Sequence, residues 1–424
     1  MKVKIYPSKC FGEILIPPSK SIAHRAIICA SLADGKSKIE NITYSDDILA
    51  TIAGMKKLGA NIVKNKNTLY IEGVKNFSGI KDDIIDCNES GSTLRFLIPI
   101  FSLTNKKIEF KGKNRLLHRP LEIYKNIFLR QALFYKQDKK SIKILGRLQP
   151  NEYTIPGNIS SQFISGLLFA LPLLKENSTI KIIPPLESKS YIDLTIDTLK
   201  IFGIKINFVN ELTISIPGGQ KYIPTDYKVE GDFSQLAFFA VLGALNNTIT
   251  CRGLQINSKQ GDKEIIKILK KTGIKIEKLK DGYRFFKGIP KGNIINLENC
   301  PDLGPILTVF SSYGNGNFKL YNTQRLRYKE SDRIVSMEKE LRKFGVEISS
   351  DKNNIYIKGK TKYNSCGEVF GHKDHRVIMS LAIFATLLDT PLIINGAEFI
   401  SKSYPNFFED LKKINIFLKI YNED

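Results

Sequence analysis

The sequence lacks the features of a membrane protein and of a secreted, disulfide-linked protein. No window among its 424 residues reaches the roughly 18 uncharged apolar residues of a membrane span, and residues 1–6 contain no apolar signal region. Its six cysteines form no C-x-x-C pair and have long, irregular spacings, which argues against a disulfide framework and a zinc site. We therefore expect a cytoplasmic protein with reduced, mostly buried thiols. A soft rule of about 150 residues per domain predicts two or three domains.

Nucleotide-binding and metal-binding motifs are missing as well. Residues 30–37, ASLADGKS, resemble a phosphate-binding P-loop, but Ala30 replaces its first glycine and a predicted helix, rather than a strand, precedes it. No G-x-G-x-x-G opens a strand–helix unit, so the dinucleotide fingerprint is absent. His372 and His375 are three residues apart, whereas paired ligands on one helix face are usually four apart. We therefore predict neither a cofactor nor a metal.

Acidic residues are too few to balance the basic ones. The chain has 64 Lys and Arg against 42 Asp and Glu, a formal net charge of +22. Such an excess would suit a nucleic-acid surface or a positive cleft for a small anion. However, 51 of the 64 cations are lysines, scattered along the chain rather than gathered in blocks, which is typical of a general surface bias. We predict no nucleic-acid partner, and a nucleic-acid-binding repeat protein remains the alternative from another class.

What the chain does contain is an internal repeat. A small polar or acidic cluster opens an apolar run rich in Ala, Leu and Phe, and the clusters recur every 70 to 72 residues. They begin at residues 19, 90, 160, 232, 302 and 374. Each run is followed by a turn, a short strand and a second, amphipathic helix, predicted at 47–58, 191–202, 263–272 and 331–344. The glycines that follow these helices suit left-handed helix ends, and they are Gly59, Gly203, Gly273 and Gly345. Alternating strands are then expected at 60–63, 204–206, 274–276 and 346–348.

The first helix of each repeat is apolar nearly all round, so we expect it to be buried, with the second helix outside. Six buried helices cannot share one small core, and two sets of three are the economical packing. If the polar helix starts face one cleft, their free N–H groups build an anion site. For any single cluster, simple N-capping is the alternative.

Nine motifs in order resemble those of the EPSP synthase family, the 3-phosphoshikimate 1-carboxyvinyltransferases. They lie at 18–25 (PSKSIAHR), 90–95 (SGSTLR), 118–121 (HRPL), 160–163 (SSQF), 229–232 (VEGD), 301–302 (PD), 327–333 (RYKESDR), 374–376 (DHR) and 402–408 (KSYPNFF). The resemblance implies an α/β fold, a two-domain inside-out α/β barrel built from six repeats of buried helix, strands and outer helix. Domain one would be 1–17 with 230–424, domain two 18–229, and the active site would lie in the cleft between them.

The resemblance also implies a reaction in the shikimate pathway to chorismate and the aromatic amino acids. The enolpyruvyl group of phosphoenolpyruvate passes to the 5-hydroxyl of shikimate 3-phosphate, and phosphate leaves. The related transferases that act on UDP-N-acetylglucosamine are the alternative. That family opens with a Lys-Asn motif and usually carries a cysteine in the loop before its Arg-Pro, whereas residues 112–120 here, GKNRLLHRP, contain none.

Site roles follow from the resemblance, residue by residue. Asp302 is the candidate base on the 5-hydroxyl, and Glu330 with Lys20 is the candidate acid/base pair, although the two carboxylates could exchange roles. The shikimate 3-phosphate residues would be Lys20, Ser21, Arg25, Ser160, Ser161, Gln162, Ser188, Tyr191, Asp302 and Lys329. The phosphoenolpyruvate residues would be Lys20, Gly91, Ser92, Arg119, Gln162, Arg333, Arg376 and Lys402. The resemblance implies a monomer that uses two small-molecule substrates, with no membrane, cofactor or metal.

Plainer interpretations compete for some of these residues. Asp302 could merely cap its helix, and Glu330 with Arg333 could be a solvated i, i+3 pair. Lys402 could be a surface lysine, and Tyr191 could belong to the core. Departures from the family pattern occur at Glu89, where many members have Asn, at Arg325, where some have Asn, and in the stretch 139–151. Glu89 is left out of the predicted site.

Overall fold

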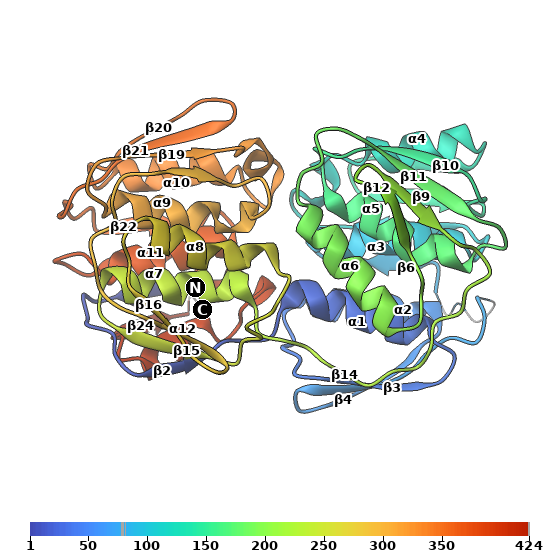
Figure 1. The fold of residues 1–424 in the computed structure, drawn as a ribbon, viewed down its shortest axis with the longest axis horizontal. Helices are drawn as coiled ribbons and strands as arrows, with labels where there is room; N and C mark the ends of the chain where they lie inside the picture. The colour runs from blue at the N-terminus through green and yellow to red at the C-terminus, as the bar shows by residue number, and fades with distance from the viewer. Residues whose placement is uncertain (78–79, 81, 423–424) are drawn as a thin grey trace. The chain divides into compact units, whose positions relative to one another are not determined.

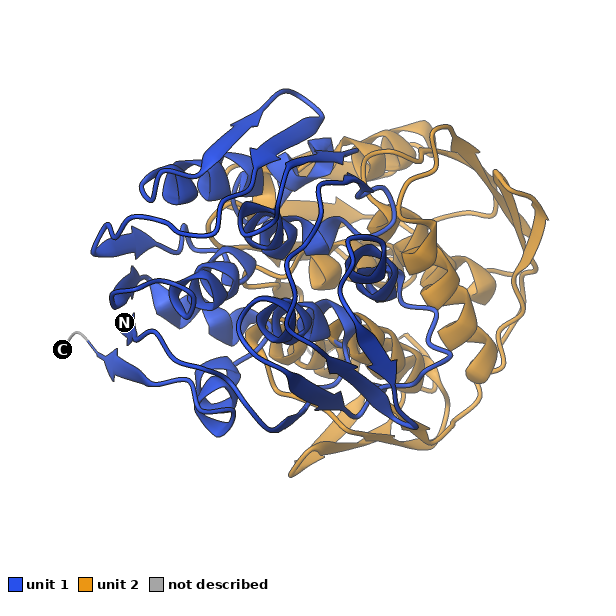
Figure 2. Ribbon diagram, turned by 60° about the vertical axis from the view of Figure 1, so that its left-hand side comes forward, with its two compact units in different colours: residues 1–19, 230–424 blue, residues 20–229 orange. Residues whose placement is uncertain are grey.

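Chain contacts divide the molecule into two compact units. The computed structural model describes residues 1–77, 80 and 82–422 (Figure 1). Unit 1 comprises residues 1–19 and 230–424, and unit 2 comprises residues 20–229 (Figure 2). Unit 2 is therefore a continuous segment inserted into unit 1.

In the described part of each unit, three α-helices are nearly fully buried and three are less buried. The buried helices of unit 1 are α7 (Phe233–Leu245), α9 (Gly304–Ser312) and α11 (His375–Ala385). Its other helices are α8 (Glu264–Lys271), α10 (Arg333–Arg342) and α12 (Phe407–Lys413). The buried helices of unit 2 are α1 (Lys20–Leu32), α3 (Gly91–Ser102) and α5 (Ser161–Ala170). Its other helices are α2 (Asp46–Leu58), α4 (Glu122–Arg130) and α6 (Lys189–Ile201).

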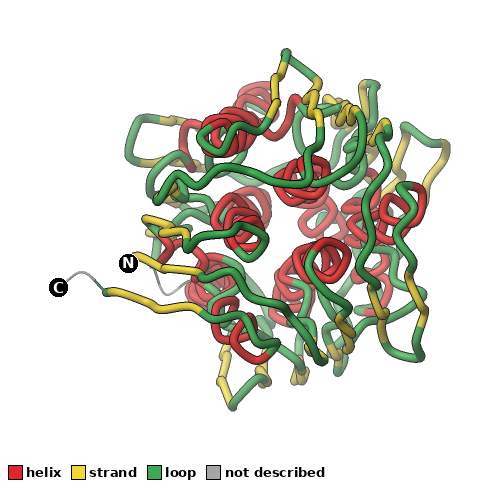
Figure 3. The backbone as a smooth tube through the Cα atoms, turned by 90° about the vertical axis from the view of Figure 1, so that its left-hand side faces the viewer, coloured by secondary structure: helices red, strands yellow, loops and turns green. Residues whose placement is uncertain are grey.

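Six four-stranded sheets share one pairing pattern, in which a parallel edge pair is followed by two antiparallel pairings. In unit 1 the orders are β22 (Glu368–Phe370), β23 (Leu392–Asn395), β1 (Lys2–Ile5), β24 (Leu418–Tyr421); β2 (Glu13–Leu15), β15 (Ile249–Arg252), β17 (Gly282–Phe285), β16 (Ile276–Lys278); and β18 (Ile294–Asn296), β19 (Asn317–Tyr321), β21 (Asn354–Lys358), β20 (Glu347–Ser350). In unit 2 they are β10 (Glu152–Pro156), β11 (Ser178–Ile183), β13 (Thr213–Ile216), β12 (Asn207–Asn210); β14 (Tyr227–Lys228), β3 (Lys36–Glu40), β5 (Thr68–Glu72), β4 (Asn61–Asn65); and β6 (Ile84–Asp86), β7 (Ile108–Lys111), β9 (Ser141–Leu145), β8 (Phe134–Gln137). Figure 3 colours the strands yellow and the helices red. The common pattern confirms the six repeats predicted from the sequence.

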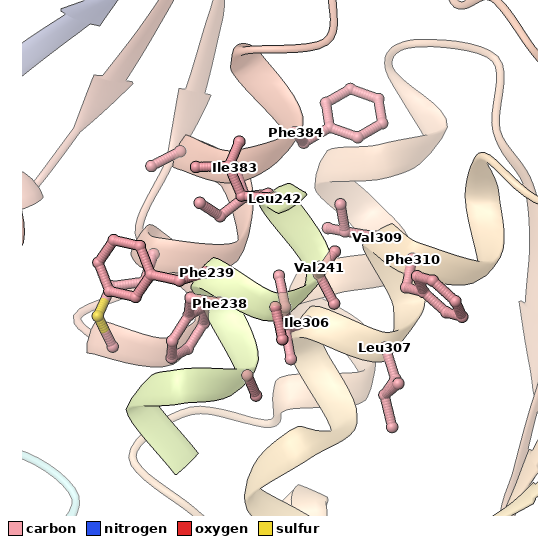
Figure 4. Close-up of a cluster of buried hydrophobic side chains, with 14 of the residues drawn as sticks. Phe238, Phe239, Val241, Leu242, Ile306, Leu307, Val309, Phe310, Ile383 and Phe384 are labelled. Atoms are coloured by element: carbon pink, nitrogen blue, oxygen red, sulfur yellow. The ribbon is translucent and has the colours of Figure 1, made fainter. Parts of the chain in front are cut away.

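The buried helices form the cores because their apolar side chains point in all directions. In unit 1, side chains from α7, α9 and α11 interdigitate, among them Phe238, Leu242, Ile306, Phe310 and Phe384 (Figure 4). Each is at most 1% exposed, and burying one such side chain stabilises the fold by about 1.5–3 kcal/mol. Unit 2 has its own core around α1, α3 and α5.

At four of the six clusters a polar residue caps the helix start, as the N-capping interpretation predicts. Ser90, Ser160, Asp232 and Asp374 are N-caps whose side chains accept hydrogen bonds from backbone N–H groups of the following turn. The predicted helix ends are confirmed too, since Gly59, Gly203, Gly273 and Gly345 have φ between 77° and 120°. The helix bounds differ from the predicted ones by one or two residues at most ends.

One predicted strand is wrong. Residues 204–206 are irregular, and strand β12 begins only at Asn207. The side chain of Gln220 takes the place of a strand partner here. Its Oε1 accepts from the Lys205 N–H (2.7 Å), and its Nε2 donates to the Lys205 carbonyl (3.0 Å).

The thiols agree with the sequence prediction. Five of the six cysteines are buried, Cys366 is partly exposed, and all six are free. Among the described residues, no helix combines the length and the apolar character that crossing a membrane demands.

Candidate active site

Asp302 lies at the centre of a charged cluster in unit 1. It sits in a 3₁₀ turn (Pro301–Leu303) before α9, and the N-cap of α9 is Leu303 rather than Asp302. Its Oδ1 accepts from Arg333 Nη1 (3.0 Å) and Lys329 Nζ (3.1 Å), and its Oδ2 accepts from Arg376 Nη2 (3.0 Å). Asp302 is therefore bound by three cations, and the helix-cap interpretation is wrong.

Arg333 is the side chain that joins the carboxylates of this cluster. It is 2% exposed and begins α10. Its Nε donates to Asp374 Oδ2 (2.9 Å), and its Nη2 donates to Glu330 Oε2 (2.8 Å) and Asp374 Oδ1 (3.3 Å). Burial lowers its pKa, but Asp374, Glu330 and Asp302 outweigh burial and raise it. The guanidinium therefore stays charged inside the protein.

The structure also corrects two plainer interpretations of the sequence. Glu330 and Arg333 do form an i, i+3 pair, but their side chains are 10% and 2% exposed, so the pair is not solvated. Lys402 is 4% exposed at its side chain and is not a surface lysine. Its Nζ lies 3.8 Å from Glu330 Oε1, which brings a second cation to that carboxylate.

Charge balance shows what this cluster can bind. Arg333, Arg376, Lys329 and Lys402 face the carboxylates of Asp302, Glu330 and Asp374, which is four cations against three anions. Burial raises the pKa of Asp302, but Arg376, Lys329 and Arg333 outweigh burial and hold it well below its usual range. Burial in turn lowers the pKa of Lys329. A carboxylate or phosphate that entered here could replace a protein carboxylate as the partner of an arginine.

In unit 2, Lys20 forms an ion pair that the sequence did not indicate. Lys20 begins α1, and its Nζ donates to Asp47 Oδ2 (2.7 Å) in the first turn of α2. The side chains are 17% and 6% exposed, so Lys20 retains some access to solvent. No sequence motif identified Asp47, because its partner is set by the packing of α1 against α2.

Arg25 links α1 to α6 inside unit 2. Its Nε donates to Thr195 Oγ1 (2.8 Å), its Nη2 to the Tyr191 carbonyl (3.0 Å) and its Nη1 to the Ser21 carbonyl (2.5 Å). Burial lowers its pKa to about 10. Tyr191 is partly buried against the unit 2 core, so part of the core interpretation holds, and its N–H donates to the carbonyl of Ser188 (3.1 Å). Ser188 precedes α6 with a φ of 56°.

A second group of predicted residues meets at the starts of α3 and α5. Gln162 Nε2 donates to Ser92 Oγ (3.0 Å), and its Oε1 accepts from Arg95 Nη1 (2.7 Å). Gly91 leaves room for the neighbouring cations, since a Cβ there would lie 2.8 Å from Arg119 Nη1 and 3.4 Å from Arg95 Nη1. Arg95, which the predicted site omitted, is therefore part of this group.

Two predicted serines lie at the N-terminal end of α5. Ser160 is the N-cap and accepts from the Gln162 N–H (3.3 Å), and Ser161 is the first helical residue. Both lie where free N–H groups of a helix start can meet an anion.

Glu89 and Arg325, which depart from the family pattern, form hydrogen bonds with nearby residues. Glu89 Oε1 accepts from Asn114 Nδ2, and Arg325 Nη2 donates to the Glu298 carbonyl. Part of the stretch 139–151 forms β9.

Known proteins resemble this chain over its full length. A family model described as EPSP synthase (3-phosphoshikimate 1-carboxyvinyltransferase) matches residues 6–411. A Clostridium perfringens protein named 3-phosphoshikimate 1-carboxyvinyltransferase is 48% identical over 421 residues, 99% of each chain. A Clostridioides difficile protein of the same name is 45% identical, with 97% of each chain covered.

Solved structures share the fold as well. EPSP synthase from Acinetobacter baumannii matches with a TM-score of 0.82 at 25% identity, over 99% of this chain and 100% of that chain. The enolpyruvyl transferase NikO from Streptomyces tendae matches with a TM-score of 0.79 at 15% identity, over 99% of this chain and 98% of that chain, which shows a common fold alone.

Proposed function

Because this chain belongs to the EPSP synthase family, we propose that it is a 3-phosphoshikimate 1-carboxyvinyltransferase. It transfers the enolpyruvyl group of phosphoenolpyruvate to the 5-hydroxyl of shikimate 3-phosphate and releases phosphate. The reaction belongs to the shikimate pathway to aromatic amino acids. The alternative acceptor, UDP-N-acetylglucosamine, is not favoured, because the matched relatives carry the shikimate name.

The observation that carries the proposal is the buried cluster around Asp302 and Arg333. The reaction breaks the carbon–oxygen bond of phosphoenolpyruvate and joins two anionic substrates, so its site needs several cations beside an acid/base pair. The cluster supplies the cations and both candidate carboxylates, with Arg376 beside Asp302 and Lys402 beside Glu330.

We assign the chemical steps to this chain's residues as follows. Asp302 takes the proton of the 5-hydroxyl as its oxygen attacks C2 of phosphoenolpyruvate. Glu330, with Lys20, delivers a proton to the C3 methylene, which gives a tetrahedral adduct. The same pair then takes a proton back from C3 while the C2–O bond to phosphate breaks. The proton taken up by Asp302 leaves with the departing phosphate as hydrogen phosphate, so each side chain regains its starting protonation state and no further reactant is needed.

Asp302 is a poor base while three cations hold its carboxylate. The pKa of Asp302 lies well below its usual range in this arrangement. Phosphoenolpyruvate carries a carboxylate and a phosphate, and both compete for Arg333 and Arg376. Substrate binding would therefore release Asp302 from its arginines and strengthen it as a base at the moment when it is needed.

Unit 2 supplies the remaining binding groups in this proposal. Arg119, Gly91, Ser92 and Gln162 would contact phosphoenolpyruvate together with Arg333, Arg376 and Lys402. The phosphate of shikimate 3-phosphate would lie at Ser160 and Ser161, with Gln162 and Ser188 of unit 2 and Lys329 of unit 1 beside it. Lys20, Ser21, Arg25 and Tyr191 would complete that site.

Catalysis in this scheme needs residues from both units on one pair of substrates. We propose domain limits of 1–17 with 230–424 and 18–229, and closure of the two domains on binding. We infer a cytoplasmic monomer with no nucleic-acid partner, since the excess positive charge can serve to attract two small anions.

Release of phosphate from the two substrates tests the proposal. Asp302→Ala and Lys20→Met should each lower kcat by about a hundredfold or more, because each removes a group in direct contact with the reacting atoms. Matched controls are Asp281→Ala and Lys38→Met, whose side chains form exposed pairs with Arg252 and Glu40. Near-full activity of both Asp302→Ala and Lys20→Met would refute the assigned site, and no phosphate release by the unaltered protein would refute the function.

A further inference from the structure

Glu340 is a buried carboxylate for which the proposed reaction has no use. It lies on α10, seven residues after Arg333 and therefore on the same face of that helix, and its side chain is fully buried. Oε1 lies 2.6 Å from His372 Nε2, and Oε2 accepts from the Phe370 N–H (3.2 Å) and lies 2.6 Å from Lys343 Nζ. Because a carboxylate only accepts, His372 Nε2 carries the hydrogen in this contact.

The contacts of Glu340 reach a turn with an uncommon backbone. His372 and Lys373 have φ values of 52° and 55°, a left-handed conformation that non-glycine residues seldom adopt. Such residues persist where surrounding contacts hold them. The turn is held by the bond from the Gly371 N–H to the Asn395 carbonyl (2.9 Å) and, from α10, by Glu340.

Directly after this turn come two residues of the charged cluster. Asp374 caps α11 and accepts from Arg333, and Arg376 donates to Asp302. Helix α10 is thus joined to one short segment at two points. At its first residue Arg333 binds Asp374, and two turns later Glu340 binds Phe370 and His372.

We propose that Glu340 is a positioning residue that sets the turn 371–373 and thereby places Asp374 and Arg376 for phosphoenolpyruvate. The inference rests on the proposed function, because it takes Arg376 as a ligand of that substrate. Glu340 itself touches no substrate and acts through His372 and the Phe370 N–H.

Ionisation of Glu340 supports this role. Burial raises its pKa, but the contacts with His372, Lys343 and the Phe370 N–H outweigh burial and lower it. Glu340 is therefore a charged acceptor, and hydrogen bonds to charged groups are stronger than neutral ones. If Glu340 is replaced, the Phe370 N–H loses this acceptor. His372 also loses its contact with the Glu340 side chain of α10.

Three variants separate positioning from stability. Glu340→Leu keeps the bulk of the side chain and removes its contacts with His372, the Phe370 N–H and Lys343. His372→Gly removes one contact while giving that residue free access to positive φ. Glu340→Gln keeps an acceptor for Phe370 and should recover part of the loss. Glu338→Leu is the matched control, since Glu338 lies on the same helix but bonds to Arg342 and Ser350.

Steady-state kinetics with each substrate varied in turn give the first readout. We expect Glu340→Leu and His372→Gly to raise the KM for phosphoenolpyruvate by about tenfold, the factor that one charged hydrogen bond supplies. The KM for shikimate 3-phosphate should stay within about twofold. A role in stability alone would lower the active fraction and leave both KM values unchanged. That result, or an equal effect in Glu338→Leu, would overturn the proposal.

Amide hydrogen exchange gives a readout that needs no turnover. Exchange at residues 371–376 should quicken in Glu340→Leu and His372→Gly, at a temperature where both variants remain folded, and not in Glu338→Leu. Unchanged exchange in that segment would overturn the positioning role even if the enzyme is active. Quickened exchange in a protein without transferase activity would keep the positioning role and reject the proposed function.

Discussion

Asp374 and Arg333 form a fully buried two-contact ion pair, in which Arg333 Nε lies 2.9 Å from Asp374 Oδ2 and Arg333 Nη2 lies 3.3 Å from Asp374 Oδ1. Asp374 also accepts from the Ser331 hydroxyl (3.1 Å) and caps α11 through the Arg376 N–H (2.9 Å). One carboxylate thus fixes the arginine, the loop before α10 and the start of α11.

Removal of this carboxylate should destabilise the fold strongly. Asp374→Ala leaves the buried guanidinium of Arg333 with one partner fewer and removes a helix cap, so we expect a loss of about 3–5 kcal/mol. Urea unfolding measures it. Asp332→Ala is the control, since Asp332 caps α10 by accepting from Ile334 and Val335, and loss of a cap costs about 1 kcal/mol. Equal losses in the two variants would contradict the special role of Asp374.

His24 should make the fold sensitive to mild acid. It is fully buried, its Nδ1 lies 2.7 Å from Thr51 Oγ1, and burial lowers its pKa to about 3. The unfolded chain takes up this proton below pH 6.5, and the folded chain does not until about pH 3. The stability contribution is therefore fully present above pH 6.5 and is lost as the pH falls toward 3, at about 1.4 kcal/mol per pH unit.

The measurement is urea unfolding at pH 7 and pH 5. The unaltered protein should lose about 2 kcal/mol from this group over that interval, and His24→Gln should lose correspondingly less. His118→Gln, at an exposed histidine, should behave like the unaltered protein. An identical pH dependence in His24→Gln and the unaltered protein would show that His24 is not kept neutral by burial.

Gly91→Ala should weaken phosphoenolpyruvate binding selectively. The new methyl group would lie 2.8 Å from Arg119 Nη1, which must move, and the backbone can accept alanine because Gly91 begins an ordinary helix. We expect the KM for phosphoenolpyruvate to rise about tenfold, with a smaller change for shikimate 3-phosphate. Gly288→Ala, where the nearest atom is a single Ile274 methyl at 3.1 Å, is the control. A rise only in the shikimate 3-phosphate KM would reverse the assignment of the two subsites.

Lys329→Met should shift the acid limb of the rate profile. Lys329 is one of three cations that hold the pKa of Asp302 below its usual range, so its removal raises that pKa. If Asp302 acts as a base, the fall of kcat on acidification should begin at a higher pH than in the unaltered enzyme. The pH dependence of kcat measures the shift, with Lys358→Met as an exposed control. If the fall of kcat on acidification occurs at the same pH in both proteins, Asp302 is not the base.

The sequence predicts the repeat architecture well because its signals are local. Each buried helix can be recognised from about a dozen consecutive, mostly apolar residues. Each helix end can be recognised from the single glycine that follows it. The strand at 204–206 failed because the side chain of Gln220, fifteen residues away, replaces a strand partner of Lys205.

Charged pairs are predicted less well, since tertiary packing chooses the partners. Lys402 and the Glu330–Arg333 pair look like surface residues in the sequence, yet all three side chains are at most 10% exposed. Asp47 and Glu340 carry no motif of their own, and their roles become visible only when neighbouring elements bring Lys20 and His372 to them.

The insertion of residues 20–229 between the two parts of unit 1 determines the order in which the two units can fold during protein synthesis. Every strand of the inserted unit's three sheets has been synthesised by residue 228, so that unit can fold while the rest of the polypeptide is still being made. Strand β2 can pair once β15 (Ile249–Arg252) has been synthesised, whereas β1 must wait for β23 and β24, the second of which ends at Tyr421. A truncated nascent chain would therefore yield a finished inserted unit attached to an unpaired leading strand.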